Sequence, residues 1–222
     1  MTILVPSTGA ESWRPLLQSE GHWRKGGSAR SLAHAWSDSA GFPKEVQRAL
    51  DESDVLAGTR MLVGIPAHQV QLPGSGAAAH TDLWVLGRSP SALVSIAVDG
   101  MVSASFGPTV NEWRETTTDE GRARVDGLLQ LLRIDSVPGT TPYQLLHRAA
   151  SAVLEARRFT AKHAVMLVHS FDEDDAWFDD FGAFASIFNA EPRKYGFARS
   201  ANHADPTLHL GWVQGEARFL EG

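Results

Sequence analysis

Leu83-Trp-Val-Leu86 and Leu93-Val-Ser-Ile-Ala-Val98 are the two short apolar runs that decide the fold of this chain. Both are rich in β-branched and aromatic residues, and the segment 87–91 between them contains Pro90. Two runs of this composition joined by a short turn segment are typical of antiparallel strands. The pattern therefore predicts a β-hairpin.

Two helices and a strand are predicted before the hairpin. Apolar residues recur at helical spacing within residues 28–50 and are interrupted at Gly41-Phe-Pro43, which predicts two short helices separated by a turn. Residues 60–72 contain an aliphatic run that ends in alternation, and Pro73-Gly-Ser-Gly76 follows. This pattern indicates an extended strand closed by a turn.

Helical and extended patterns alternate after the hairpin. Residues 110–132 suit a helical stretch, and Thr141-Pro142 offers an N-cap with proline in the first turn of a further helix. The apolar run 163–169 predicts a strand, and the acidic residues 172–175 are placed to begin a helix that carries several aromatic side chains. Residues 208–213 predict a last strand.

The central order of these segments is helix-strand-strand-strand-helix-strand. This order predicts a mixed β-sheet flanked by helices, in the α/β (α+β) class. With 222 residues and no sharp change of composition, the chain is expected to form a single domain over residues 1–222. Residues 1–27 are interpreted as a less ordered N-terminal arm.

The composition narrows the chemistry that the chain can support. There is no cysteine, which excludes disulfides, thiolate nucleophiles, iron–sulfur clusters and cysteine-ligated zinc. A bound metal must therefore use oxygen or imidazole ligands, and we expect no haem.

Charge and hydropathy bear on partners and location. A formal charge of −6 argues against broad attraction to phosphate backbones, although a local basic groove is compatible with it. The chain shows neither a signal-peptide pattern nor an apolar run long enough to cross a bilayer. We therefore expect a cytoplasmic protein without a membrane partner.

Two aspartates flank the predicted hairpin strands. Asp82 precedes the first apolar run and Asp99 follows the second, so antiparallel pairing brings both carboxylates to the same end of the sheet. The parity of the register decides whether they share a face. Paired carboxylates with a backbone carbonyl form a hard oxygen site that suits Mg²⁺ or Mn²⁺, and such an ion can drive phosphodiester cleavage. The alternative is that both carboxylates cap backbone amides beside turns.

The order of elements and the spacing of the acids resemble the PD-(D/E)XK endonuclease-like superfamily. In that superfamily an aspartate begins one strand and an acid-x-lysine triplet ends the next, which Asp82 and Asp99 match, but Met101 stands in place of the lysine. Some branches add a histidine on the first helix and a glutamine on the helix after the third strand, where His34 and Gln144 fall. The resemblance implies Asp82, Asp99 and His34 as metal ligands, with Gln144 positioning the water or phosphate.

The missing lysine predicts weakened or lost cleavage. A lysine ammonium orients the attacking water and stabilises developing charge, whereas the Met101 thioether carries neither a proton nor a positive charge. Another cation could approach from the following helix, because Arg148 lies one turn beyond Gln144.

The chain also looks similar to a family of bacterial proteins with no assigned activity. The resemblance rests on Val168-His-Ser-Phe-Asp172 and Tyr143-Gln-Leu-Leu-His-Arg148, variants of which occur in that family. It adds no expectation about substrate.

Two other classes of function stay open. The first is a non-catalytic module that binds a protein or a nucleic acid, which would be favoured by aspartates too far apart to share one ion. The second is a small-molecule hydrolase with His147 or His169 as its base, which would require an enclosed apolar pocket around those histidines. Oligomeric state and the choice between DNA and RNA do not follow from the sequence.

Overall fold

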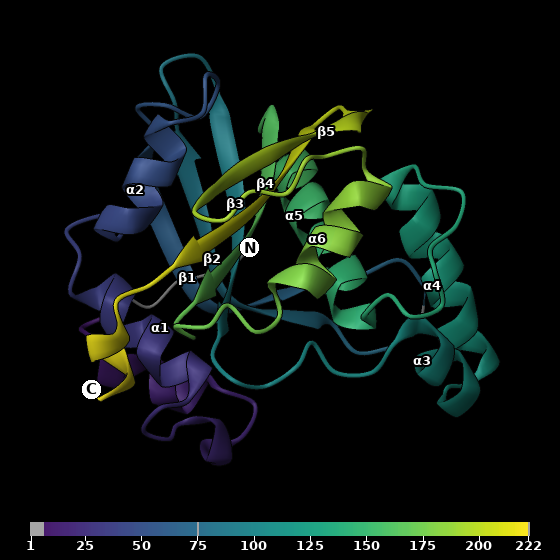
Figure 1. Ribbon diagram of the computed structural model, residues 1–222, viewed down its shortest axis with the longest axis horizontal. Coiled ribbons are helices and arrows are strands. Elements are labelled where there is room, and N and C mark those ends of the chain that lie inside the picture. Colours follow the sequence, from purple (N-terminus) through teal and green to yellow (C-terminus); the bar gives the residue numbers. More distant parts are fainter. Residues whose placement is uncertain (1–6, 75, 222) are drawn as a thin grey trace.

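The computed structural model describes residues 7–74 and 76–221, and within them the strands form one six-stranded mixed sheet in the order β1-β2-β3-β4-β6-β5 (Figure 1). The β1–β2, β2–β3 and β5–β6 pairs are antiparallel, whereas β3–β4 and β4–β6 are parallel. The strand bounds are β1 (Arg60–Val70), β2 (Ala79–Arg88), β3 (Leu93–Met101), β4 (His163–Ser170), β5 (Gly196–Ala204) and β6 (Thr207–Gln214).

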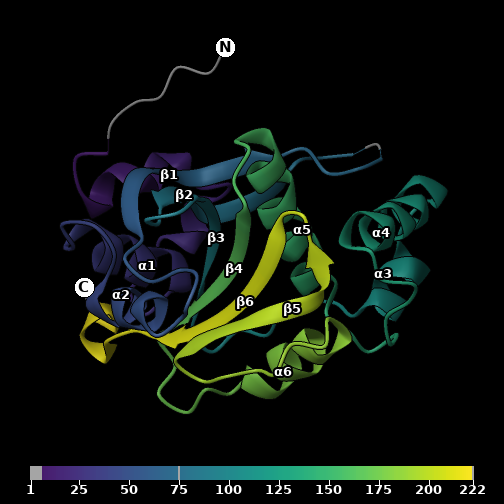
Figure 2. The same ribbon diagram turned by 90° about the horizontal axis from the view of Figure 1, so that it is seen from above.

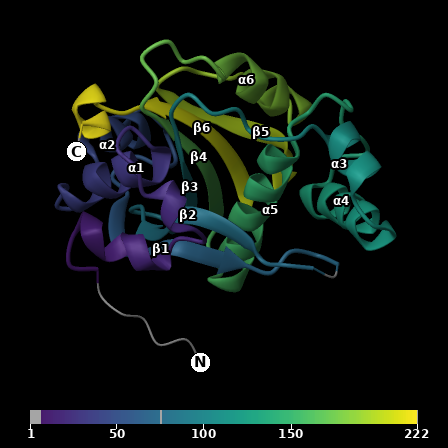
Figure 3. The ribbon, with the colours of Figure 1, turned by 90° about the horizontal axis from the view of Figure 1, so that it is seen from below.

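Helices cover both faces of this sheet, as Figures 2 and 3 show from above and below. One face carries α1 (Ser28–Ser37) and α2 (Lys44–Asp51), together with the 3-10 helices η1 (Ala10–Leu16), η2 (Glu20–His22) and η3 (Ala217–Leu220). The other face carries α5 (Tyr143–Arg158) and α6 (Phe178–Ile187), with α4 (Asp119–Leu132) packed on α5 and α3 (Val110–Thr116) beside α4. None of the helices in the described ranges has the length and apolar character needed to cross a membrane.

Alternation along the central strands divides the core in two. In β3, Val94, Ile96 and Val98 belong to the cluster under α1 and α2, whereas Ala97 and Met101 belong to the cluster under α5 and α6. Successive side chains of a strand point to opposite faces, so a strand between two helical layers is apolar on both sides. This explains why the β3 sequence is a nearly continuous apolar run.

The structure confirms the predicted mixed α/β fold and most of its elements. The hairpin strands β2 and β3 are present, but both are longer than the apolar runs that predicted them. The helical stretch 110–132 is two helices, because Thr118 caps the start of α4 with its side chain. Thr141 is not the N-cap of α5, since Pro142 takes that position and no side chain caps it.

The strand β5 was missed at the sequence level. Its sequence alternates short and polar side chains, which gives no clear two-residue hydrophobic period. Gly196–Arg199 pair with β6, and the register then shifts before Ala204. Pairing with a buried neighbour, rather than local propensity, therefore defines this edge strand.

Part of the predicted N-terminal arm lies outside the described residues, namely residues 1–6. From residue 7 onward the chain forms η1 and η2, and Trp13 is buried in the cluster that includes α1. The Gly26 N–H donates to the Leu220 carbonyl at 3.0 Å, which ties the segment before α1 to η3.

A candidate functional site at the ends of strands β2 and β3

Asp82 and Asp99 lie near each other at the ends of neighbouring strands. Leu83 pairs with Val98 in the antiparallel β2–β3 register, so Asp82 and Asp99 are the next residues outward. Directly opposed residues share a face of the sheet. That face is the one covered by α5, because Asp99 alternates in step with Met101. The Gly100 N–H donates to Asp82 Oδ2 at 2.9 Å, which fixes this carboxylate over the end of β3.

Asp99 is buried against a cation from α5. Its side chain is 7% exposed, and Arg148 Nε lies 2.9 Å from Asp99 Oδ1. The Asp82 backbone also interacts with the Asp99 carboxyl and favours its charged form. Nη1 of Arg148 is buried and has no hydrogen-bond partner among the described residues, so the close ion pair leaves hydrogen-bonding capacity on the guanidinium.

Burial raises the pKa of Asp99 to about 7, against the opposing effect of the Arg148 charge and with a further upward contribution from Asp82. The adjacent guanidinium favours the charged carboxylate, but this attraction does not offset the hydration free energy that the carboxylate loses on burial. Near neutral pH this carboxyl is therefore partly protonated.

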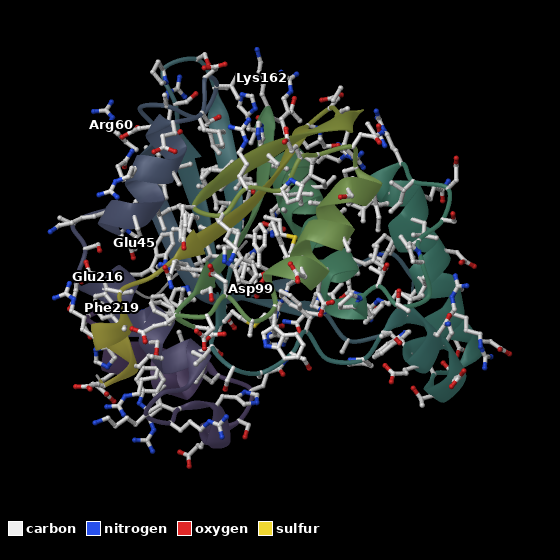
Figure 4. All side chains as sticks on the ribbon, in the orientation of Figure 1. Glu45, Arg60, Asp99, Lys162, Glu216 and Phe219 are labelled. Carbon is white, nitrogen blue, oxygen red and sulfur yellow. The ribbon has the colours of Figure 1, made fainter. Side chains whose placement is uncertain are left out.

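A polar pocket of about 530 Å³ opens beside these residues. Figure 4 shows that Asp99 itself lies in the interior of the molecule. The lining comes from the ends of the central strands, the loop after β3, the first turns of α5 and the segment leading into α1. Its members include His80, Asp82, Gly100, Met101, Ser103, Ser105, Gln144, Arg148, His22, Arg24, Gly27 and Ser28.

The topology brings these elements together. Because β3 and β4 are parallel, the chain between them must run back along the sheet to the end where β4 starts. Helix α5 makes this connection and begins near the end where β3 finishes. Gln144 and Arg148 are four residues apart and lie on one side of α5, facing that end. On the other face, a Cβ added to Gly100 would lie 2.8 Å from the Ser28 carbonyl oxygen, so glycine allows α1 to begin against β3.

The predicted site residues are only partly gathered. Asp82 and Gln144 line the pocket, and Asp99 lies buried behind it against Arg148, whereas His34 does not line the pocket and its ring stacks on Trp23 with 6.4 Å between centroids. No group of three or more His, Asp or Glu side chains in the described ranges could hold a metal ion. The protein therefore offers two carboxylates, without His34 beside them.

His80 is a pocket residue that sequence reasoning missed. It precedes Asp82 by two residues on β2 and lines the pocket with it. Burial and the Arg148 charge lower the pKa of His80, and Asp82 opposes them, so the imidazole is neutral at pH 7. The two-residue spacing was visible in the sequence, but β2 was predicted to begin later, which left His80 outside the strand.

His147 and His169, the candidate bases of a small-molecule hydrolase, lie outside the polar pocket. His169 is fully buried, its Nδ1 accepts a hydrogen bond from Trp36 Nε1 at 3.1 Å, and its Nε2 lies 3.0 Å from Glu45 Oε1. These contacts assign the ring proton to Nε2. Burial lowers the pKa of His147, with Arg148 and Arg124 adding to the effect, and neither histidine lines the polar pocket. Both positions favour structural roles.

Asp82 and Asp99 carry oxygen ligands of the kind that Mg²⁺ and Mn²⁺ prefer. Mg²⁺ is commonly held by one or two carboxylates and completes its shell with water and phosphate oxygens. The oxygens of Asp99 and the remaining oxygen of Asp82 suit this mode. Arg148 already neutralises Asp99, so an ion must compete with the guanidinium.

No curated protein and no solved structure matches this chain. One family model, described as a domain of unknown function (DUF6946), matches residues 6–217. Because the match spans nearly the whole sequence, the chain belongs to the DUF6946 family.

Proposed function

We propose that the polar pocket binds a phosphodiester group of a nucleic acid and supports slow, metal-dependent hydrolysis of it, in the manner of the PD-(D/E)XK nucleases. The observation that carries the proposal is the proximity of Asp82 and Asp99 at the ends of β2 and β3, beside Gln144 and Arg148 of α5. Two helices before the three antiparallel strands and the helix α5 before β4 are compatible with it. The Met101 position argues for low activity.

Each pocket residue has a role that its chemistry allows. Asp82 and Asp99 would hold Mg²⁺ or Mn²⁺, which supplies a polarised water and neutralises charge at the phosphorus. The Gln144 amide can donate to a phosphate oxygen and accept from a water molecule. Nη1 of Arg148 is buried without a hydrogen-bond partner among the described residues and can donate to an anion. Met101 contributes no proton and no charge where the superfamily places its lysine.

Calorimetric titration of Mg²⁺ and Mn²⁺ tests the metal site. We expect weak binding to the wild-type protein and none to an Asp82→Asn, Asp99→Asn variant. An Asp179→Asn, Asp180→Asn variant is the matched control, because it removes the same charge from exposed positions on α6. Equal binding by all three proteins would contradict the assignment of the two ligands.

Cleavage of labelled oligonucleotides by the same three proteins tests the reaction. The expected result is slow, Mn²⁺-dependent cleavage by the wild type and the control, with none by the variant that lacks both ligands. Cleavage that survives in that variant would show a contaminating nuclease or another site.

A second candidate is binding without catalysis, and the Arg148–Asp99 contact favours it. At 2.9 Å, the guanidinium already neutralises the carboxylate that would otherwise need a metal ion. In this case oligonucleotides bind in the presence of EDTA, and calorimetry detects no Mg²⁺ or Mn²⁺ binding.

A further inference from the structure

The polar pocket is walled on opposite sides by segments distant in sequence. One wall is the stretch that leads into α1, with Leu17, His22, Arg24 and Gly27 among its lining residues. The opposite wall is formed by residues 102–105 and the first turns of α5. Asp82 and Met101 line the pocket between these walls, so a ligand that reaches them must enter between the two.

The wall before α1 is held in place at several points. Trp13 is buried in the core cluster, and Trp23 stacks on His34. The Gly26 N–H donates to the Leu220 carbonyl at 3.0 Å, and the Gly27 N–H donates to the Arg24 carbonyl at 2.9 Å. These contacts make the wall part of the folded structure, so a wide ligand would have to displace it.

The lining is rich in groups that bind anions and bases. Arg24 and Arg148 approach from opposite walls, and Asp82 is the sole acidic residue among the described residues that line the pocket. The imidazole rings of His22 and His80 also line it. Histidine rings stack with unpaired bases, and arginines pair with the phosphates of the same strand.

The size of the pocket separates single strands from duplexes. Its volume of about 530 Å³ falls within the roughly 300–1,000 Å³ typical of small-ligand sites. In a duplex each strand is accompanied by its complement across a major groove about 12 Å wide. A pocket of this volume holds at most a few nucleotides, so both strands of a duplex do not fit within it.

We infer that the pocket admits one strand of a nucleic acid, with a phosphate between Arg24 and Arg148 and a base against His22 or His80, and excludes the double helix. This inference rests on the proposed function and specifies its substrate class. Discrimination arises from the fixed wall before α1.

Fluorescence anisotropy in EDTA tests the inference without requiring cleavage. The probes are labelled single-stranded DNA and RNA of about 12 nucleotides, within the ~4–16 nucleotides that such sites span. Their blunt duplexes, and a duplex with a single-stranded tail, complete the set. We expect the single strands and the tailed duplex to bind about tenfold more tightly than the blunt duplexes.

Two single variants locate the binding. Arg24→Gln and His22→Ala change exposed residues of the wall, so the fold is retained, and each is expected to weaken single-strand binding about three- to tenfold. Arg157→Gln, which removes an exposed charge at the other end of α5, should leave binding unchanged.

The outcomes distinguish the inference from the proposed function. Blunt duplexes that bind as tightly as single strands would overturn the inference and leave phosphodiester binding intact. Single-strand binding that is insensitive to both wall variants would place the strand elsewhere and also overturn it. If no oligonucleotide binds to the wild-type protein either in EDTA or in Mg²⁺, the proposed function itself fails.

Discussion

Met101 ends β3 at the edge of the polar pocket, and its side chain is 6% exposed within the core cluster under α5. A longer, charged side chain at this position would extend toward the open space beside Asp82 and Asp99. Lysine keeps its aliphatic stem against apolar neighbours and places its ammonium group in a polar region. Under the proposed function, a lysine at this position would supply the cation that Met101 does not.

Met101→Lys is expected to raise Mn²⁺-dependent cleavage by roughly a hundredfold, because one electrostatic donor contributes about a hundredfold to a thousandfold to transition-state stabilisation. The rate is measured on labelled single-stranded oligonucleotides at saturating Mn²⁺. Met101→Gln is the control, since it adds a polar group of similar length without charge. If Met101→Lys folds, binds Mn²⁺ and cleaves no faster than Met101→Gln, the metal-dependent mechanism is contradicted.

At the same scale, the sequence identified Asp82 and Asp99 as a pair beside the hairpin, and the resemblance to the PD-(D/E)XK superfamily added Gln144. In the structure Arg148 contacts Asp99 and lines the pocket with Asp82 and Gln144. The sequence did not identify His80 as a residue of the pocket, because the strand was predicted to begin after it. It also did not show that His34 lies away from the pocket, because the rotation of α1 about its axis depends on packing. These are properties of tertiary contacts rather than of residue types.

Helix α1 packs closely against strand β3 at Gly100, where there is no side chain between them. A Cβ at Gly100 would lie 2.8 Å from the Ser28 carbonyl oxygen and 3.2 Å from Leu32 Cβ. Both are too short for ordinary contacts, and the first involves backbone that has little freedom to move. The side chain therefore cannot grow without shifting α1 relative to the sheet.

Gly100→Ala is expected to lower the free energy of unfolding by about 1–3 kcal/mol, the usual cost of overpacking. Urea denaturation of the purified variant measures it. Gly64→Ala in β1 is the matched control, because a Cβ there meets its nearest neighbour at an ordinary 3.5 Å, and its effect should stay within about 0.5 kcal/mol. Equal stabilities for the two variants would show that α1 adjusts freely.

At this level the sequence predicted the elements whose periodicity is strong and missed the one whose pattern is weak. The helices α1, α2 and α5 and the strands β1 to β4 carry clear apolar periods. Strand β5 does not, and it exists through its pairing with β6, whose residues are almost all buried.

The whole molecule buries ionisable groups far from the pocket. His209 on β6 is 1% exposed, and its Nε2 lies 3.1 Å from His163 Nδ1. Burial lowers the pKa of His209 to about 3, with His163 and Arg199 contributing in the same direction. This residue therefore stays neutral while the protein is folded at moderately acidic pH.

Stability should consequently depend on pH through His209. Its pKa rises from about 3 to the ordinary value near 6.5 on unfolding, so the unfolded chain binds an extra proton between these limits, and the free energy of unfolding falls as pH drops below about 6.5. Between pH 7 and pH 4 this amounts to on the order of 3 kcal/mol.

Urea denaturation of wild type and His209→Gln across this range measures the effect. The stability advantage of the wild type at pH 7 should shrink by that amount at pH 4, because glutamine does not titrate. A wild-type advantage that is constant with pH would show that folding does not lower the pKa of His209.

The sequence by itself determined the α/β class, most of the helices and strands, the exclusion of thiolate chemistry and the identity of two carboxylates beside a hairpin. These features follow from composition and from the periodicity of apolar residues over short stretches of the chain. The backbone geometry of a helix or a strand sets that periodicity directly. Only the tertiary structure decided that Asp82 faces Asp99, that Arg148 neutralises Asp99, and that the segment before α1 walls the pocket. Strand register, helix rotation and the desolvation of charges arise from contacts between distant parts of the chain, and no local pattern in the sequence specifies them.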